Sequence, residues 1–132
     1  MIIILEIIIV YLISASAHEY AHSDIAYRLG DNTAKLQGRS SLNPLRHITL
    51  YGFKSVPVRH LNCKRDYILF HGAGIVVNLL LALVSLFFVS ILIFKITLFV
   101  NLWIVVINII PIKCGSRSND GYKILQHIKH NR

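Results

Sequence analysis

Acidic residues are scarce in this sequence. Among its 132 residues, Asp and Glu together number six, against fourteen Lys and Arg, and the only glutamates are Glu6 and Glu19. The N-terminus has no basic segment, which argues against a cleavable signal peptide. The two cysteines, Cys63 and Cys114, form no C-x-x-C pair, so we expect neither a structural zinc site nor a disulfide.

Charged residues are also missing from long stretches of the chain. Hydrophobic residues make up 55% of the sequence, and its mean hydropathy of +0.59 is too apolar for an ordinary soluble domain. A membrane-spanning helix needs about 20 mainly apolar residues. We therefore predict one all-α membrane domain over residues 1–132, with three transmembrane helices at about residues 2–29, 67–94 and 96–112.

The segments between and after these helices are polar. Residues 31–66 show no helical periodicity and contain prolines, so we expect a membrane-associated loop of short strands and turns. Gly30 supplies the stop for the first helix, and Pro111 disrupts the third. Residues 113–132 form a C-terminal segment that ends in a short amphipathic tail.

Basic residues are concentrated on one side of the predicted spans. Eight of the fourteen Lys and Arg lie from Arg28 to Arg65, five lie from Lys113 to Arg132, and only Lys95 lies between the second and third spans. The positive-inside rule then predicts an outside N-terminus, with the loop 30–66 and the C-terminus cytoplasmic. A net charge of +8 would also suit nucleic-acid binding, but the charge flanks the spans, so we expect no nucleic-acid partner.

The first predicted helix carries His18-Glu19-Tyr20-Ala21-His22, an H-E-x-x-H motif. Residues four apart share a helix face, so the two imidazoles can meet at one point and bind Zn²⁺. Glu19 can act there on a water as general base without binding the metal. The alternative is a helix with two unrelated histidines. Ionisable residues inside a membrane span are expensive and usually functional, which favours the metal site.

The third ligand of such a site is left open by the motif alone, although a catalytic zinc site usually takes three protein ligands. Soluble metalloprotease patterns fail, because Ile25 and Arg28 stand where a glycine and a third histidine are needed, and no glutamate follows Glu19. The aspartates and five other histidines remain. Asp24 is about 200° round the helix from His22 and faces away, whereas Asp120 follows the helix break and could fold back.

Two further motifs lie downstream, Asn108-Ile109-Ile110-Pro111 and Asp120-Gly121. Together with H-E-x-x-H on an earlier helix, they resemble the site-2 protease family of intramembrane zinc metalloproteases, which carries N-x-x-P followed by D-G. The segments Arg28–Ile48 and Pro57–Ala82 are also similar to the family, so the likeness covers most of the chain. The chain departs from it in a longer spacing between the last two motifs.

This resemblance implies that His18, His22 and Asp120 bind one zinc ion and that Glu19 is the catalytic base. It implies a zinc metalloendopeptidase that hydrolyses a peptide bond in or near the transmembrane segment of a membrane protein, in regulated intramembrane proteolysis. The expected partners are that substrate protein and the lipid bilayer, with a homo-oligomer left open. The alternative is a non-catalytic zinc-binding scaffold or immunity-type protein of the same fold.

The resemblance also places Asn78 and Asn108 near the site, where we expect them to bind substrate. Asp120 competes as third ligand with His71 and the tail histidines. His71 lies only about four residues inside its span and is therefore shallow, and the tail suits the membrane interface. A carboxylate would also offset the charge of the dication. We therefore expect Asp120→Ala to lose zinc, and His71→Ala and a His127/His130 double replacement to keep it.

Overall fold

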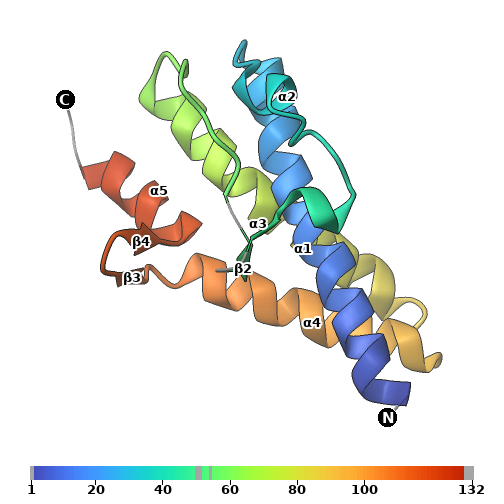
Figure 1. Cartoon of the computed structure of the whole chain (residues 1–132). Coiled ribbons are helices and arrows are strands. Elements are labelled where there is room, and N and C mark those ends of the chain that lie inside the picture. Colours follow the sequence, from blue (N-terminus) through green and yellow to red (C-terminus); the bar gives the residue numbers. More distant parts are fainter. Residues whose placement is uncertain (1, 50–51, 54, 130–132) are drawn as a thin grey trace.

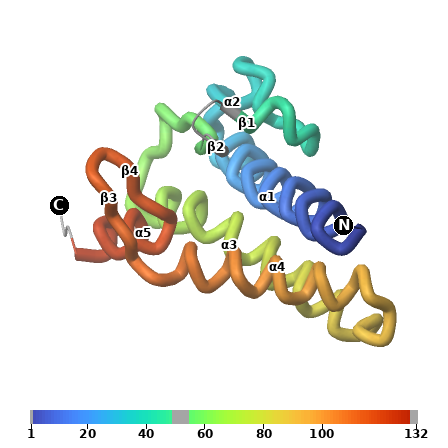
Figure 2. The backbone as a smooth tube through the Cα atoms, turned by 60° about the horizontal axis from the view of Figure 1, so that its bottom comes forward, coloured from blue at the N-terminus to red at the C-terminus, as the bar shows by residue number. Residues whose placement is uncertain are grey.

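Three long helices dominate the computed structural model, which describes residues 2–49, 52–53 and 55–129. These helices, α1 (Ile2–Arg28), α3 (Lys64–Leu86) and α4 (Leu92–Ile109), are long and apolar enough to cross a membrane. They pack against one another, and the start of α1 lies at the same end of the molecule as the turn between α3 and α4 (Figure 1 and Figure 2). The predicted all-α fold with three spans is confirmed.

The end of α1 follows from its glycine. Gly30 has a φ of +95°, a left-handed conformation that favours glycine. Its N–H donates to Tyr27 O at 3.0 Å, and Asp31 N–H donates to Ala26 O at 2.8 Å, which is the pairing of a Schellman motif. The predicted stop at Gly30 is therefore confirmed, with the helix ending at Arg28.

The other two spans have different bounds from the predicted ones. We expected one helix over residues 67–94 and the next over 96–112, but the chain turns back after Leu86 and α4 already begins at Leu92. A 23-residue helix is about 35 Å long, which is enough to cross a bilayer. The chain can therefore reverse after Leu86. Because the residues of this turn are apolar, hydrophobicity alone did not locate it. Lys95 lies in the first turn of α4 rather than before it.

The loop after α1 contains the expected short strands, and two short helices as well. Its elements are α2 (Thr33–Leu36), a 3₁₀ helix η1 (Pro44–Arg46), and the antiparallel strands β1 (Ile48–Thr49) and β2 (Gly52–Phe53). Residues 55–63, which follow, have no regular structure up to the start of α3. Asp31 anchors this run, because its buried carboxylate accepts hydrogen bonds from Arg59 N–H at 2.6 Å and His60 N–H at 2.7 Å.

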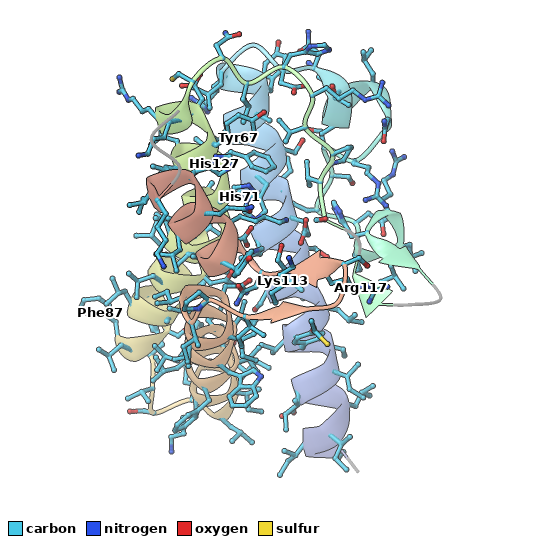
Figure 3. All side chains as sticks on the ribbon, turned by 90° about the vertical axis from the view of Figure 1, so that its left-hand side faces the viewer. Tyr67, His71, Phe87, Lys113, Arg117 and His127 are labelled. Carbon is cyan, nitrogen blue, oxygen red and sulfur yellow. The ribbon has the colours of Figure 1, made fainter. Side chains whose placement is uncertain are left out.

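The C-terminal segment folds back onto the bundle. An antiparallel hairpin, β3 (Lys113–Cys114) and β4 (Arg117–Ser118), leads into the amphipathic helix α5 (Asp120–Lys129). We predicted the amphipathic tail but not the hairpin. The His127 ring stacks on Tyr67 of α3 at 4.5 Å, and Lys64 Nζ donates to Ile128 O at 2.9 Å (Figure 3). These contacts hold the far end of α5 against the start of α3.

The interior of the bundle contains polar contacts between the helices beside its buried apolar side chains, and its outer surface is apolar. Asn78 Nδ2 of α3 donates to Asn101 Oδ1 of α4 at 2.7 Å, and Asn101 Nδ2 donates to Ser14 Oγ of α1 at 3.0 Å. Large apolar side chains, such as Phe87 at 86% exposed, point outward (Figure 3). Polar contacts between helices and an apolar exterior are typical of helix packing in lipid.

Candidate metal centre

Helix α1 brings His18, Glu19 and His22 to one cavity. The two imidazoles lie one turn apart with ring centroids 4.7 Å from each other, and both side chains are buried. His18 lies about 24 Å along the helix from Ile2 and about 15 Å from Arg28. The motif is therefore well inside the apolar length of α1.

One hydrogen-bond acceptor behind each imidazole fixes the orientation of its ring. His22 Nδ1 donates to the carbonyl of Phe70 at 2.6 Å, since a carbonyl can only accept. His18 Nδ1 faces Asn78 Oδ1 at 2.6 Å. The Asn78 amide nitrogen already donates to Asn101 Oδ1 and to Ser14 O, so this contact is also a donation from His18. The hydrogen-bond network thus assigns a proton to Nδ1 of both histidines.

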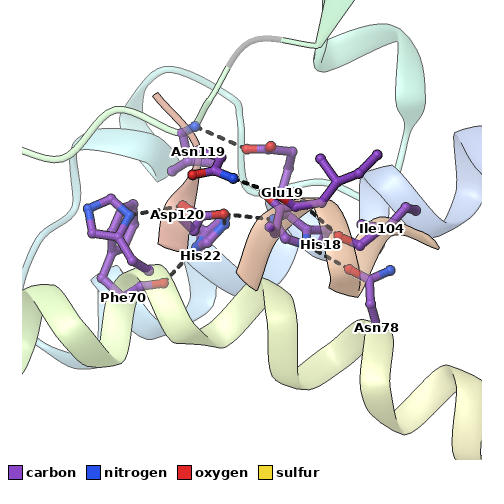
Figure 4. Close-up of polar contacts among 12 residues, drawn as sticks. His18, Glu19, His22, Phe70, Asn78, Ile104, Asn119 and Asp120 are labelled. Atoms are coloured by element: carbon purple, nitrogen blue, oxygen red, sulfur yellow. Dashed lines mark hydrogen bonds and ion pairs between the residues drawn. The ribbon is translucent and has the colours of Figure 1, made fainter. Parts of the chain in front are cut away.

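Asp120 enters this site from the first turn of α5. Its Oδ2 lies 3.1 Å from His18 Nε2 and 3.3 Å from His22 Nε2 (Figure 4). Within the described part of the chain, these residues form the one group whose donor atoms, all within 4.8 Å of one another, could hold a metal ion. The structure therefore brings together the three residues that the sequence analysis put forward as ligands.

The donor set fits a zinc ion. A neutral imidazole protonated at Nδ1 has a bare lone pair at Nε2, and both Nε2 atoms face a carboxylate oxygen, which is also an acceptor. Acceptors do not stabilise one another, so this cluster needs a cation or additional protons. Zinc binds such atoms at about 2.0–2.2 Å in a tetrahedron, which places its ligand atoms about 3.3 Å apart.

The other oxygen of Asp120 has a partner of its own. His71 Nδ1 of α3 lies 3.0 Å from Asp120 Oδ1, and the His71 side chain is buried. Burial alone would raise the pKa of Asp120, but its contacts with the imidazoles of His18, His22 and His71 hold that pKa well below its usual value. The carboxylate therefore stays ionised. Sequence analysis treated His71 only as a rival ligand and missed this contact.

Glu19 lies at the same cavity, with a separate support. Its Oε2 accepts a hydrogen bond from Val56 N–H at 3.1 Å, which comes from the irregular run after β2. The cavity has a volume of about 690 Å³. Besides the metal-site residues, its lining includes side chains of α1 and α4 and residues of the loop and the hairpin: Tyr11, Ala15, Trp103, Ile104, Ile107, Ser55, Val56, Ser116, Arg117 and Ser118.

The two asparagines expected to bind substrate lie in different places. Asn108 is half-buried and lines the cavity, and its Nδ2 donates to Ile104 O at 3.0 Å. Asn78 is fully buried behind His18 and is not among the lining residues. Its geometry suits orientation of His18. A role in substrate binding stays a prediction for both residues.

The rival ligands other than His71 lie elsewhere or outside the described residues. Asp24 pairs with Arg28 at 2.7 Å, as expected for a residue on another face of α1. His127 stacks on Tyr67, and His130 is outside the described residues.

Asn119, which the sequence analysis did not consider, caps α5 by accepting a hydrogen bond from Tyr122 N–H at 3.0 Å. Asparagine directly before an acidic first turn is a common start of a helix and could have signalled this cap.

The fold and the site together define a multi-span α-helical protein with a histidine–carboxylate site of zinc-binding type. The chain is similar to a protein of Bacillus subtilis (strain 168) named "Putative zinc metalloprotease YwhC", with 28% identity over an alignment of 153 positions. The alignment covers 92% of this chain and 68% of the relative. No protein-family model matches the chain, and no solved structure matches it. The relative supports a metalloprotease function and zinc as the metal.

Proposed function

We propose that the chain is a zinc-dependent intramembrane endopeptidase of the site-2 protease type, in which His18, His22 and Asp120 bind one zinc ion. The observation that carries the proposal is the meeting of both Nε2 atoms with Asp120, beside Glu19, at one cavity within the apolar length of α1. Similarity to a zinc metalloprotease along most of the chain supports it.

Glu19 acts as the general base in this proposal. Zinc, when bound, supplies Lewis-acid chemistry that polarises a peptide carbonyl and lowers the pKa of water. Glu19 takes the proton from the attacking water and delivers it to the leaving amine. The hydrogen bond from Val56 N–H leaves one carboxylate oxygen of Glu19 for this exchange and limits the rotation of the side chain.

The substrate is the transmembrane segment of another membrane protein. Such a segment is helical, so its carbonyls are already hydrogen-bonded and it must unwind before attack. The cavity suits an unwound segment, because Trp103 and Ile104 line one part of it and Ser55 and Val56, from an irregular run of backbone, line another. Backbone groups of that run can pair with an extended peptide by β-augmentation.

Replacement of Glu19 tests the proposal. We expect Glu19→Gln to keep one zinc ion and to abolish cleavage of single-pass membrane proteins expressed beside it, which then accumulate uncleaved. Glu6→Gln is the matched control, because Glu6 is the other glutamate of the same helix and lies about 20 Å away along it. Loss of zinc from Glu19→Gln would show that Glu19 is a ligand and not the base.

A non-catalytic zinc-binding scaffold of the same fold is the second candidate. The same measurements separate the two functions. A scaffold binds zinc in both the wild-type protein and Glu19→Gln, and neither protein cleaves any membrane substrate. The position of Glu19 at the cavity beside both histidines favours the enzyme, since a scaffold needs no base there.

A further inference from the structure

Asn119, the residue directly before Asp120, connects three elements beside the candidate metal centre. Its Oδ1 accepts from Tyr122 N–H of α5 and from Ile112 N–H, each at 3.0 Å. Its Nδ2 donates to Ile107 O of α4 and, at 2.6 Å, to Ile110 O. One side chain thus joins the end of α4, the base of the β3–β4 hairpin and the start of α5.

The contact with Ile107 replaces a hydrogen bond that the sequence removes. In a continuing helix, the carbonyl of Ile107 would accept from the N–H four residues later. That residue is Pro111, which has no N–H. Asn119 Nδ2 supplies the missing donor from twelve residues further along the chain. The last carbonyls of a helix need such partners. The carbonyls at the end of α4 and the side-chain amide of Asn119 therefore satisfy each other's hydrogen-bonding capacity.

The hairpin closes at the same residue. Asn119 N–H donates to Ile112 O at 3.2 Å, while Ile112 N–H donates to the Asn119 side chain. The backbone that leaves α4 therefore returns to it after the hairpin, and Asp120 is the next residue. A Cβ on Gly121 would lie 2.5 Å from Asn108 O, so the first turn of α5 is packed directly against the end of α4.

We propose that Asn119 is the positioning residue that sets Asp120 at the metal centre. By capping α5 and binding the end of α4, it fixes the backbone on which Asp120 reaches His18 and His22. This inference rests on the proposed zinc site. Asn119 itself is not a ligand, because its side-chain nitrogen and oxygen are both used by backbone groups.

Zinc titration of Asn119→Ala in chelator-buffered solution tests this role. We expect zinc affinity to fall roughly 10–100-fold, the usual effect of losing a group that supports a ligand. We also expect faster hydrogen–deuterium exchange in residues 112–125, with the helical circular dichroism retained. Asn43→Ala is the matched control, because Asn43 Oδ1 likewise caps a helix, η1, by accepting from Leu45 N–H at 3.0 Å, far along the chain from Asp120. It should keep wild-type zinc affinity.

Asn119→Ser separates the cap from the tie to α4. Serine is a good cap, but it is too short to reach the carbonyls of Ile107 and Ile110 as well. We expect its zinc affinity to remain below that of wild type. Full restoration by serine, or wild-type affinity in Asn119→Ala, would overturn the proposal. So would a general loss of helix in Asn119→Ala, because Asn119 would then hold the whole fold.

Failure of the proposed function has a different signature. In that case the wild-type protein itself binds no zinc. Hydrogen exchange then decides the role of Asn119 alone: faster exchange confined to residues 112–125 in Asn119→Ala supports it, and unchanged exchange there overturns it.

Discussion

At the scale of single residues, the candidate metal centre is built in two layers. The inner layer consists of His18, His22 and Asp120, and a different group supports each of them: Asn78 behind His18, the Phe70 carbonyl behind His22, and His71 behind Asp120. Partners of this kind set the tautomer and orientation of a ligand, and their loss weakens a metal site without removing it. The two layers therefore predict different effects on zinc.

His71 and Asp120 give the clearest contrast between the layers. We expect Asp120→Ala to lose zinc completely, because it removes a ligand with a negative charge. We expect His71→Ala to bind one zinc ion at saturation with an affinity lowered roughly 10–100-fold, because Asp120 Oδ1 loses its partner. Isothermal titration with zinc measures both effects.

His127→Ala is the control for this comparison. The His127 ring stacks on Tyr67 at 4.5 Å, lies 6.1 Å from the His71 ring and comes from the far end of α5. We therefore expect the zinc affinity of His127→Ala to stay close to that of wild type. Stoichiometric zinc in Asp120→Ala would move the third ligand to another residue. Complete loss of zinc in His71→Ala would place His71 among the ligands.

Sequence alone put forward the inner layer and, through the family resemblance, the nearness of Asn78, but not the contacts of the outer layer. The spacing of His18 and His22 is a property of one helix, so it is visible in the sequence, and D-G after N-x-x-P indicated Asp120 through a family likeness. His71 acts through a contact between elements far apart in the chain, and the contacts of Asn119 depend on how the hairpin returns to the end of α4. No local pattern encodes that His71 meets Asp120, since this depends on how α5 lies on α3.

At the scale of elements, the close approach of α1 and α3 depends on Gly74. A Cβ at this position would lie 2.5 Å from the His18 ring, and that ring is rigid and held by Asn78. We expect Gly74→Ala to push the two helices apart or to displace His18, at a cost of about 1–3 kcal/mol in stability. Thermal unfolding and zinc affinity should both fall.

Gly72 provides the matched control on the same helix. Among the described residues, nothing would lie within 4 Å of a Cβ at Gly72. Alanine there should be neutral or should stabilise α3 by about 0.5–1 kcal/mol, since glycine disfavours helix. Equal effects of the two substitutions would contradict the close contact between Gly74 and His18.

The loop over the cavity is held to the end of α1 by Asp31. Burial would raise the pKa of Asp31, but hydrogen bonds from Thr33 and from the N–H groups of His60 and Arg59 hold that pKa well below its ordinary value. A carboxylate with a lowered pKa in the folded state stabilises it above its unfolded pKa of about 3.8, and loses that contribution as pH falls.

Acid should therefore loosen this loop through Asp31. We expect Asp31→Asn to be less stable than wild type at pH 7 by about 2 kcal/mol, because hydrogen bonds to a charged acceptor are lost. The difference in unfolding midpoint between the two proteins should shrink as pH falls below about 4, since Asp31 of the unfolded wild-type chain then takes up a proton while folded Asp31 stays ionised, which favours the unfolded state. A difference that stays constant from pH 7 to pH 3 would contradict the role of the charge.

At the scale of elements, hydrophobic runs predicted the number of spans but not their ends. Gly30 located the end of α1, because the left-handed backbone conformation at that position favours glycine. The reversal after Leu86 has no such residue. There the N–H groups of Phe87 and Phe88 donate to the carbonyls three residues earlier, Val84 O and Ser85 O. An apolar turn inside an apolar run becomes visible only when the helices are packed.

At the scale of the whole molecule, the relative placement of the helix ends is fixed by the fold. Cys63 directly precedes α3 and Cys114 follows α4, and both are exposed. Lys95 lies at the opposite end of α3, which is about 35 Å long and exceeds the hydrocarbon core of about 30 Å. Any membrane that contains these spans must therefore separate the two cysteines from Lys95.

The charge distribution then predicts which side is which. The cysteines flank the basic segments, so the positive-inside rule places them in the cytoplasm and Lys95 outside. A membrane-impermeant maleimide should label Cys63 and Cys114 in inverted vesicles but not in intact cells. Lys95→Cys, in a background with both native cysteines replaced by serine, should label in intact cells. If all three positions label from one face, the three-span fold is wrong. If the two faces are exchanged, the three-span fold stands, but the positive-inside rule fails for this protein. The basic segments beside Cys63 and Cys114 would then lie on the outer side of the membrane.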